Sequence, residues 1–329
     1  MAWEEGEEDL ARLQIFEDHS RQILSHNDSP DLRHRWSLNP YRGCMHACAY
    51  CYARASHEYL GFGAGTDHDV KILVKPRAPE LLAEAFDHPS WVGEPVLFSG
   101  NTDCYQPIEH RYRLTRRCLE VCLRYRNPAW LITKSALVAR DLDLLTALHA
   151  EAQAHVVLSI PFADAETARK IEPGAPSPER RFQALEALAR AGVPVGVNIA
   201  PVFPGLNDRD IPRLLRRAAD AGARSAGYIL VRLVGAVEAV CVQRLQEAFP
   251  TRAEVLLRRI RRARGGELGS TRFGDRMRGQ GEEWAVVHDL FHLWCDRLGL
   301  RSGFGENEPS PSTFRRPGSG VQLGLFPRP

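Results

Sequence analysis

The 329 residues are enough to bury a full hydrophobic core, either as one large α/β domain or as two smaller ones. Hydrophobic residues make up 44% and charged residues 26%, as in globular proteins, which excludes a chain that is disordered throughout. The formal net charge is only +2, so overall charge alone directs the protein to no polyanion.

The N-terminal residues show neither a basic segment followed by an apolar stretch nor a cleavage site. No run of the sequence reaches the length of a membrane span. We therefore expect a cytoplasmic protein with no membrane partner. Thiols stay reduced in that compartment, so clustered members of the eight cysteines are expected to be metal or redox ligands rather than disulfides.

Apolar runs alternate with amphipathic stretches along most of the chain. A first strand is expected before Cys44, and the following strands are expected at 94–100, 129–134, 155–160, 193–202 and 225–233. These runs are apolar throughout, which is typical of strands covered on both faces. Helices are expected between them at 114–126, 136–152, 178–192 and 210–222, with Gly192 and Gly222 as C-caps.

A repeated strand–helix series predicts a parallel sheet, closed or partly closed, with its working site at the C-terminal ends of the strands. After about residue 250 the pattern becomes helical and basic, ending in a helix expected over 282–300. The last residues are rich in Pro, Ser, Gly and Arg, which predicts a disordered tail. The expected division is an N-terminal extension (1–34), a core (35–234), a helical basic region (235–306) and the tail (307–329).

Three cysteines, Cys44, Cys48 and Cys51, lie within eight positions in the loop expected after the first strand. Cysteine thiolates are the usual ligands of iron–sulfur clusters, normally one per iron in a four-iron cluster. Three ligands leave one iron open, as catalytic metal sites do. The alternative is a zinc-bearing nucleic-acid-binding protein without catalysis, with His46 or His57 as fourth ligand, although zinc sites more often use two separated ligand pairs.

The spacing Cys-x3-Cys-x2-Cys, with Tyr50 just before the last cysteine, resembles the signature of the radical S-adenosylmethionine (SAM) enzymes. Five segments, "NPYRGCMHACAYCYAR", "GNTDCYQPIE", "TKSALVARDLDLL", "EPGAPSPERR" and "FGDRMRGQG", are together similar to the spore photoproduct lyase-like branch, often labelled DNA repair photolyases. The resemblance covers approximately residues 35–300. It implies an α/β fold, a partial (β/α)6 radical SAM barrel with a helical C-terminal extension.

The same resemblance implies that Cys44, Cys48 and Cys51 bind a 4Fe-4S cluster whose open iron takes the amino and carboxylate groups of SAM. An electron from the reduced cluster would cleave SAM and release a deoxyadenosyl radical, which abstracts hydrogen from the substrate. The electron donor is then expected to be a protein such as flavodoxin or ferredoxin.

Contacts to SAM are also implied by position within the family pattern. Lys134 would meet the SAM carboxylate, Ser159 would bind the ribose or methionyl part, and the backbone at Tyr50 would flank the adenine. The family's motif for the SAM amino group lies at the strand end formed by Ser99, Gly100, Asn101, Thr102 and Asp103. A lysine offers a point charge to a carboxylate, and glycine allows close approach of the backbone to a ligand.

Each assignment has a structural alternative. Lys134 could be a solvated strand-end residue and Ser159 a turn former, while Asp103 and Glu172 could be loop caps or satisfied polar residues. Asp103 and Cys104 are the catalytic candidates. Spore photoproduct lyase uses a cysteine near this strand end to return a hydrogen atom to its product radical. Cys104 is offset from that place and stands where close relatives usually carry proline. Its structural alternative is a small buried residue.

The remaining cysteines have simpler interpretations. Cys118 and Cys122 are four apart, on one face of an expected helix, and Cys295 lies on the last expected helix, so core packing explains all three. Cys241 belongs to no pattern.

The resemblance implies DNA with a crosslinked pyrimidine as the substrate, whereas a peptide, RNA or small metabolite is the alternative. The basic region 256–278 offers arginines that could contact a nucleic-acid backbone: Arg258, Arg259, Arg261, Arg262, Arg272 and Arg276.

The expected tail contains "QLGLF", with Gln322, Leu323, Leu325 and Phe326. It resembles the short peptide with which bacterial repair proteins and polymerases bind the sliding clamp. Apolar residues of a flexible tail have no core of their own to join, so they suit binding to a groove on a partner.

Overall fold

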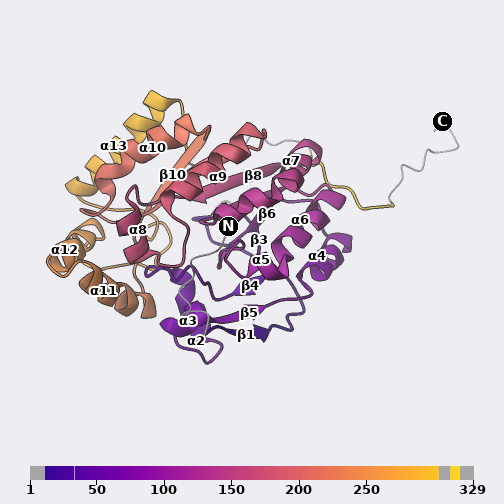
Figure 1. Cartoon of the computed structure of the whole chain (residues 1–329), viewed down its shortest axis with the longest axis horizontal. Coiled ribbons are helices and arrows are strands. Elements are labelled where there is room, and N and C mark those ends of the chain that lie inside the picture. Colours follow the sequence, from indigo (N-terminus) through magenta and orange to yellow (C-terminus); the bar gives the residue numbers. More distant parts are fainter. Residues whose placement is uncertain (1–11, 33, 304–311, 319–329) are drawn as a thin grey trace.

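The computed structural model of the protein describes residues 12–32, 34–303 and 312–318. Over these ranges a sheet of eight strands has the order β11-β10-β9-β8-β7-β6-β3-β2 (Figure 1). Its parallel series comprises β3 (Trp36–Leu38), β6 (Val96–Phe98), β7 (Ala129–Thr133), β8 (Ala154–Ser159), β9 (Val195–Val202) and β10 (Ser225–Leu230). Antiparallel β2 (Leu24–His26) and short parallel β11 (Arg301–Ser302) form the edges. The predicted α/β fold with a parallel sheet in a partial barrel is confirmed.

Helices connect successive parallel strands. They are α4 (Ala78–Asp87), α5 (Glu109–Tyr112), α6 (Leu114–Arg124), α7 (Leu142–Glu151), α8 (Ala165–Ile171), α9 (Pro178–Arg190) and α10 (Ile211–Asp220), with 3₁₀ turns η2 (Ala136–Asp141) and η3 (Asp208–Asp210). The single helix predicted over 136–152 is thus divided into η2 and α7. Gly192 and Gly222 have φ angles of +85° and +94° after α9 and α10, which confirms them as C-terminal capping residues.

A second sheet supports the cysteine loop. It contains β1 (Gln14–Glu17), β5 (Lys71–Val74) and β4 (Tyr41–Arg42), with β5 in the middle. The cysteine loop therefore follows β4 of the small sheet directly, and not the first strand of the main sheet as predicted. Three short helices come after the cysteines: η1 (Tyr52–Arg54), α2 (Ala55–Glu58) and α3 (Thr66–Val70).

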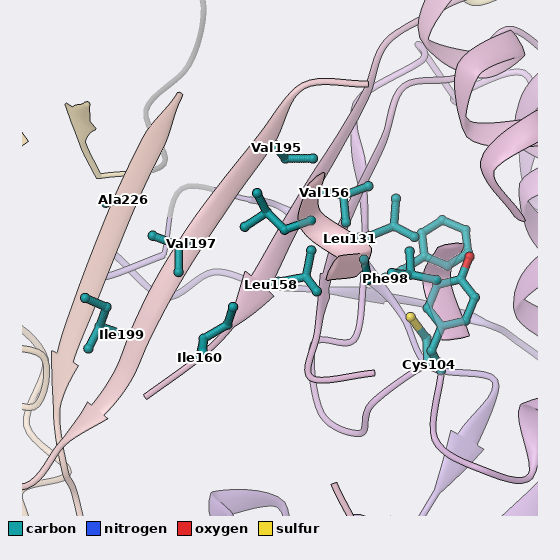
Figure 2. Close-up of a cluster of buried hydrophobic side chains, with 14 of the residues drawn as sticks. Phe98, Cys104, Leu131, Val156, Leu158, Ile160, Val195, Val197, Ile199 and Ala226 are labelled. Carbon is teal, nitrogen blue, oxygen red and sulfur yellow. The ribbon is translucent and has the colours of Figure 1, made fainter. Parts of the chain in front are cut away.

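The hydrophobic core takes alternate residues from the strands. Val156, Leu158 and Ile160 along β8 lie beside Val195, Val197 and Ile199 of β9, with Phe98, Leu131 and Ala226 from the other strands (Figure 2). Buried helix residues such as Leu119, Leu185 and Leu215 belong to the same cluster. Because successive strand residues point to opposite faces, Ser159 and Asn198 lie on the other face of the sheet.

The C-terminal helices pack directly on this framework. They are α11 (Ala236–Ala248), α12 (Ala253–Ala263) and α13 (Glu282–Leu298), and α13 packs against α10. Residues 312–318 return to the opposite side of the sheet, where the Phe314 ring stacks on Tyr125 with centroids 6.3 Å apart. The Arg316 guanidinium donates to the carbonyl oxygen of Phe86 at 3.1 Å. Packing of these seven residues departs from the disordered tail expected from composition.

No helix in the described part of the chain is long and apolar enough to span a bilayer. The pentapeptide of residues 322–326 lies outside the described residues.

Candidate active site

The cysteine loop, residues 43–51, has a backbone conformation imposed by buried polar contacts. Gly43 has φ +77°, and a Cβ there would lie 2.7 Å from the Lys71 carbonyl oxygen, so no side chain fits. The fully buried Gln106 bonds to the loop twice: its amide nitrogen donates to Gly43 O at 2.9 Å, and its oxygen accepts from Met45 N at 3.0 Å. Gln106 was not predicted from the sequence, where it is one polar residue of the segment "CYQPIE".

The three cysteines of this loop are free thiols. Cys44 and Cys48 are buried and Cys51 is partly exposed. Burial is the main cause that raises the pKa of Cys44 well above its ordinary value, and the charges of Asp103, Cys48 and Cys51 raise it further. Burial likewise raises the pKa of Cys48 to about 12. Thiolates here repel one another and need a bound cation to be stable.

This donor set fits a four-iron cluster. Across the described residues, no three His, Cys, Asp or Glu side chains are grouped to hold a single metal ion. A cluster makes a different demand, since each thiolate binds a different iron and the sulfurs stay apart. Of the two histidines considered as zinc ligands, His46 has Nδ1 3.3 Å from Asp103 Oδ2 and His57 has Nε2 2.9 Å from Lys71 O. In the described structure His46 Nε2 and His57 Nδ1 are buried without a hydrogen-bond partner, so each histidine keeps one ring nitrogen for a metal.

A buried charged chain lies behind the cysteines. The Arg54 side chain is 1% exposed and donates from Nε to Cys48 O at 3.0 Å and from Nη2 to Asp69 Oδ1 at 2.9 Å. Asp69 also lies 3.2 Å from Nδ1 of His68, whose backbone carbonyl accepts from Cys44 N. Burial would raise the pKa of Cys51, but the neighbouring His68 lowers it. Neither Arg54 nor His68 was singled out from the sequence.

Lys134, at the end of β7, lies beside Tyr50 of the cysteine loop, and its contact with the SAM carboxylate stays a prediction. Its Nζ is 5.6 Å from the centroid of the Tyr50 ring. Burial opposes its charge, but Cys48, Glu172 and Asp103 raise its pKa above the ordinary value, so it stays a cation. Lys134 is therefore a positive group beside the cysteine loop that could meet an anionic ligand.

Glu172 joins the cysteine loop to β8. It accepts the Tyr50 hydroxyl and the Arg181 guanidinium, the latter at 2.6 Å. Arg181 also donates to the carbonyl oxygen of Ser159 at 3.0 Å. Ser159, Glu172 and Arg181 are all 4% exposed or less. Glu172 is therefore a buried polar residue with hydrogen-bond donors, which agrees with the structural alternative given for it above.

Asn198 is a candidate site residue that sequence reasoning missed. It is the β9 register partner of Ser159, and its Oδ1 is buried without a hydrogen-bond partner in the described structure. A buried acceptor left unpaired costs about 1 to 3 kcal/mol unless a ligand or water donates to it. The signal in the sequence is a lone polar residue within the apolar run "VPVGVNIAPV".

The strand end after β6 contains the predicted residues 99–103. Ser99 has φ +77°, and its hydroxyl accepts from Cys104 N at 2.9 Å. Gly100 O accepts the Tyr52 hydroxyl, and Asn101 N donates to Asn39 Oδ1 at 2.8 Å. These residues keep some exposed surface beside the cysteine loop, except Thr102, whose buried hydroxyl donates to Tyr41 O at 2.7 Å.

The Asp103 carboxylate has donors on both oxygens. Thr133 Oγ1 donates to Oδ1 at 2.6 Å and Lys134 N donates to Oδ2 at 2.7 Å. Burial would raise the pKa of Asp103, but His46 and these donors bring it far below the ordinary value. In this geometry Asp103 fixes the end of β7, and a catalytic role stays a prediction.

Cys104 belongs to the core. Its side chain is 0% exposed and lies beside Phe98 (Figure 2). Burial raises the pKa of its thiol well above the ordinary value. This placement agrees with the alternative of a small buried residue, so a role as hydrogen donor stays a prediction. Cys118, Cys122, Cys241 and Cys295 are buried in the same core.

The basic region has two parts. Arg258, Arg261 and Arg262 of α12 line an open surface cavity of about 570 Å³. Arg276, expected to contact a phosphate, instead pairs with Asp31 at 2.6 Å, because a carboxylate of the N-terminal segment lies within its reach.

Comparison with known proteins agrees with this geometry. Residues 38–218 match the family described as the Radical SAM superfamily. An uncharacterised protein of Mycobacterium tuberculosis is 36% identical over 218 residues, 66% of this chain and 64% of that protein. A Radical SAM Nalpha-GlyT isomerase of Pseudomonas phage M6 is 24% identical over 289 residues, 84% of this chain and 55% of that protein. The chain thus spans less than two thirds of the length of these relatives.

Solved structures show the same fold. A spore photoproduct lyase mutant with bound AdoMet and dinucleoside spore photoproduct has a TM-score of 0.64 at 17% identity, covering 89% of this chain and 83% of that chain. Another mutant of that enzyme, with dinucleoside spore photoproduct, has a TM-score of 0.64 at 18% identity, covering 92% and 86%.

The contacts of Asp103 give a testable prediction. Asp103→Ala leaves the Thr133 hydroxyl and the Lys134 amide without an acceptor, so we expect the free energy of unfolding to fall by about 2 to 5 kcal/mol. Asp103→Asn keeps one acceptor and should lose less. Urea unfolding of the cluster-free protein, followed by circular dichroism, measures the change.

The control is Asp164→Ala, which removes an exposed carboxylate that caps α8 through Thr167 N and should cost about 0.5 to 2 kcal/mol. An Asp103→Ala variant as stable as the parent, but inactive with SAM, would instead favour the catalytic role.

Proposed function

The chain belongs to the Radical SAM superfamily, and from this premise we propose that it is an enzyme that binds a 4Fe-4S cluster and SAM. The observation that carries the proposal is one loop with three free cysteines beside the cation of Lys134. The unpaired Oδ1 of Asn198, beside Ser159 in the sheet, adds a free acceptor. These groups come from separate segments that meet at the C-terminal ends of the strands.

Cys44, Cys48 and Cys51 would hold the cluster. When bound and reduced, a cluster with one open iron supplies the electron that cleaves the carbon–sulfur bond of SAM, giving methionine and a deoxyadenosyl radical. Gln106 and Arg54 keep the loop in place through its backbone carbonyls. Hydrogen bonds and charges around the sulfurs are among the factors that set a cluster's potential.

SAM would be bound by residues that surround this loop. Lys134 would pair with its carboxylate, and the strand end of Ser99, Gly100 and Asn101 would take its amino group. Ser159 and Asn198 would bind the ribose or methionyl part, where the unpaired Oδ1 of Asn198 accepts a hydroxyl or amino proton. The backbone at Tyr50, whose hydroxyl is held by Glu172, would flank the adenine.

The finer proposal concerns the substrate. Damaged DNA is supported by the fold of spore photoproduct lyase, whose mutant is described with bound dinucleoside spore photoproduct, and by the arginines that line a surface cavity on α12. A lyase reaction on a crosslinked pyrimidine is then the reaction class. A substrate other than DNA is the alternative within the same radical chemistry. The electron donor would be a flavodoxin or ferredoxin.

The cluster proposal predicts the result of removing its ligands. The wild type, reconstituted anaerobically, should be brown and, after dithionite reduction, release deoxyadenosine from SAM. A Cys44, Cys48, Cys51 triple alanine variant should lack iron and leave SAM intact. Iron and sulfide analysis and chromatography of the nucleoside measure both.

Cys295→Ala on α13 is the matched control and should keep iron and activity. A colourless wild type that binds zinc and leaves SAM intact would contradict the proposal and favour the zinc alternative.

A second prediction concerns Lys134. Lys134→Met should weaken SAM binding about 10- to 100-fold, as expected for a lost charge-assisted hydrogen bond, with the iron content unchanged. Equilibrium dialysis with labelled SAM measures the affinity. The control is Lys170→Met on α8, where Nζ pairs with Glu166 at 2.7 Å. Equal affinity of Lys134→Met and wild type would remove the carboxylate contact.

We further propose that residues 322–326 bind the sliding clamp. Residues 312–318 pack on the core, and the last two of them, Pro317 and Gly318, are exposed. Deletion of residues 322–326 should abolish binding of the purified clamp in a fluorescence titration, while deletion of residues 327–329 should not. Unchanged affinity after the first deletion would remove this proposal.

A further inference from the structure

Residues 264–281, here called the arginine loop, connect α12 to α13 and are fixed at the C-terminal end of β10. Arg264 is 8% exposed and donates to Val231 O at 3.0 Å and Leu230 O at 2.6 Å. The same guanidinium donates at 2.9 Å to the carbonyl oxygens of Arg276 and Arg278 within the loop. The loop therefore lies at the sheet edge that also bears Lys134 and Ser159, because parallel strands end at the same edge.

The loop presents an aromatic ring to solvent. Phe273 is 60% exposed, although its neighbours are firmly bound. Gly274 N donates to Asp31 Oδ1 at 2.8 Å, and Arg276 Nε donates to Asp31 Oδ2 at 2.6 Å. The Arg276 guanidinium lies 4.6 Å from the centroid of the Phe273 ring. An exposed ring in a loop that is held by hydrogen bonds is preorganised to stack on a flat partner, since little conformational entropy is lost on binding.

Positive charge surrounds this ring. The loop contains four arginines and two acidic residues, Glu267 and Asp275, and the exposed arginines are Arg272 and Arg278. Asp31 is already paired with Arg276. Arg232, half-buried just after β10, adds a further cation, and burial together with Arg232 lowers the pKa of Arg264 to about 10. Crowded cations favour an anionic partner.

Arg232 also links this surface to the cysteine site. Arg232 lies near Arg276 and Asp31 of this surface and near Tyr52, since all three affect its pKa. Tyr52 directly follows Cys51, and its hydroxyl donates to Gly100 O at the strand end where SAM would bind. The arginine loop is thus fixed at the same strand ends as the candidate active site.

We propose that the arginine loop binds an unpaired stretch of nucleic acid, with the Phe273 ring stacked on a base and Arg272 and Arg278 in contact with phosphates. Aromatic rings among arginines suit single strands because every base has a flat face and every nucleotide a charge. The inference deepens the proposed radical SAM function by naming the substrate class. It rests on that function for the reaction of the bound strand. An enzyme that acts on a base needs it outside the stack.

Anisotropy of a fluorescein-labelled 12-nucleotide single-stranded DNA, titrated with the full-length anaerobic protein, tests this inference. Phe273→Ala should weaken binding about 5- to 100-fold, the effect of one lost base–aromatic stack, and Phe273→Trp should restore it. A strand with abasic residues throughout should bind Phe273→Ala and parent equally. Arg272→Gln should reduce the slope of log affinity against log salt by about 0.7.

Tyr59→Ala removes a ring that is 89% exposed after the acidic Glu58, and as the matched control it should leave the affinity unchanged. An RNA strand of the same sequence is a second arm: Phe273-dependent binding of either polymer supports the inference, and the tighter one identifies the substrate class. Equal affinity of Phe273→Ala and parent, or equal loss on base-bearing and abasic strands, would overturn it.

Deoxyadenosine release without nucleic acid is measured on the same preparations. Normal release with no Phe273-dependent binding overturns the inference alone. Phe273-dependent binding without release of deoxyadenosine contradicts the proposed function and supports the strand-binding surface.

Discussion

Electrostatic repulsion among the thiolate forms of three neighbouring cysteines, two of them buried, is the constraint on which the rest of this site depends. Charges on Cys48 and Cys51 raise the pKa of Cys44, and a charge on Cys51 raises the pKa of Cys48. Folding nevertheless keeps them together, because the amide of Gln106 and the guanidinium of Arg54 bond to the loop backbone rather than to the sulfurs. The sulfurs therefore remain available for iron, whose positive charge removes the repulsion.

The strand ends extend this arrangement from one loop to a complete site. Asp103 bonds to Thr133 and to the Lys134 amide, so the loop after β6 sets the position of the cation at the end of β7. Glu172 joins the cysteine loop to β8 in the same way. Each buried carboxylate is paired with donors, which lowers the cost of placing charges in a low-dielectric region.

Arginines near the site divide into internal and external ones. Arg181 and Arg264 are buried and donate to backbone carbonyls, while Arg276 pairs with Asp31. Arg272 and Arg278 stay exposed beside Phe273. An arginine-rich sequence thus contributes rigidity with some side chains and a charged surface with others, and only the exposed ones can meet a phosphate.

Local sequence by itself determined the parallel α/β architecture and the three-cysteine loop. Uninterrupted apolar runs, capping glycines such as Gly192 and a spacing within eight residues are properties of neighbouring positions. Tertiary structure decided the rest: which strand leads into the loop, why Gln106 and Asn198 belong to the site, and that Arg276 pairs internally. These features depend on contacts between residues far apart in the chain, so no local pattern predicts them. The packing of residues 312–318 on the core has the same origin, because it depends on Phe86 and Tyr125 and not on the composition of the tail.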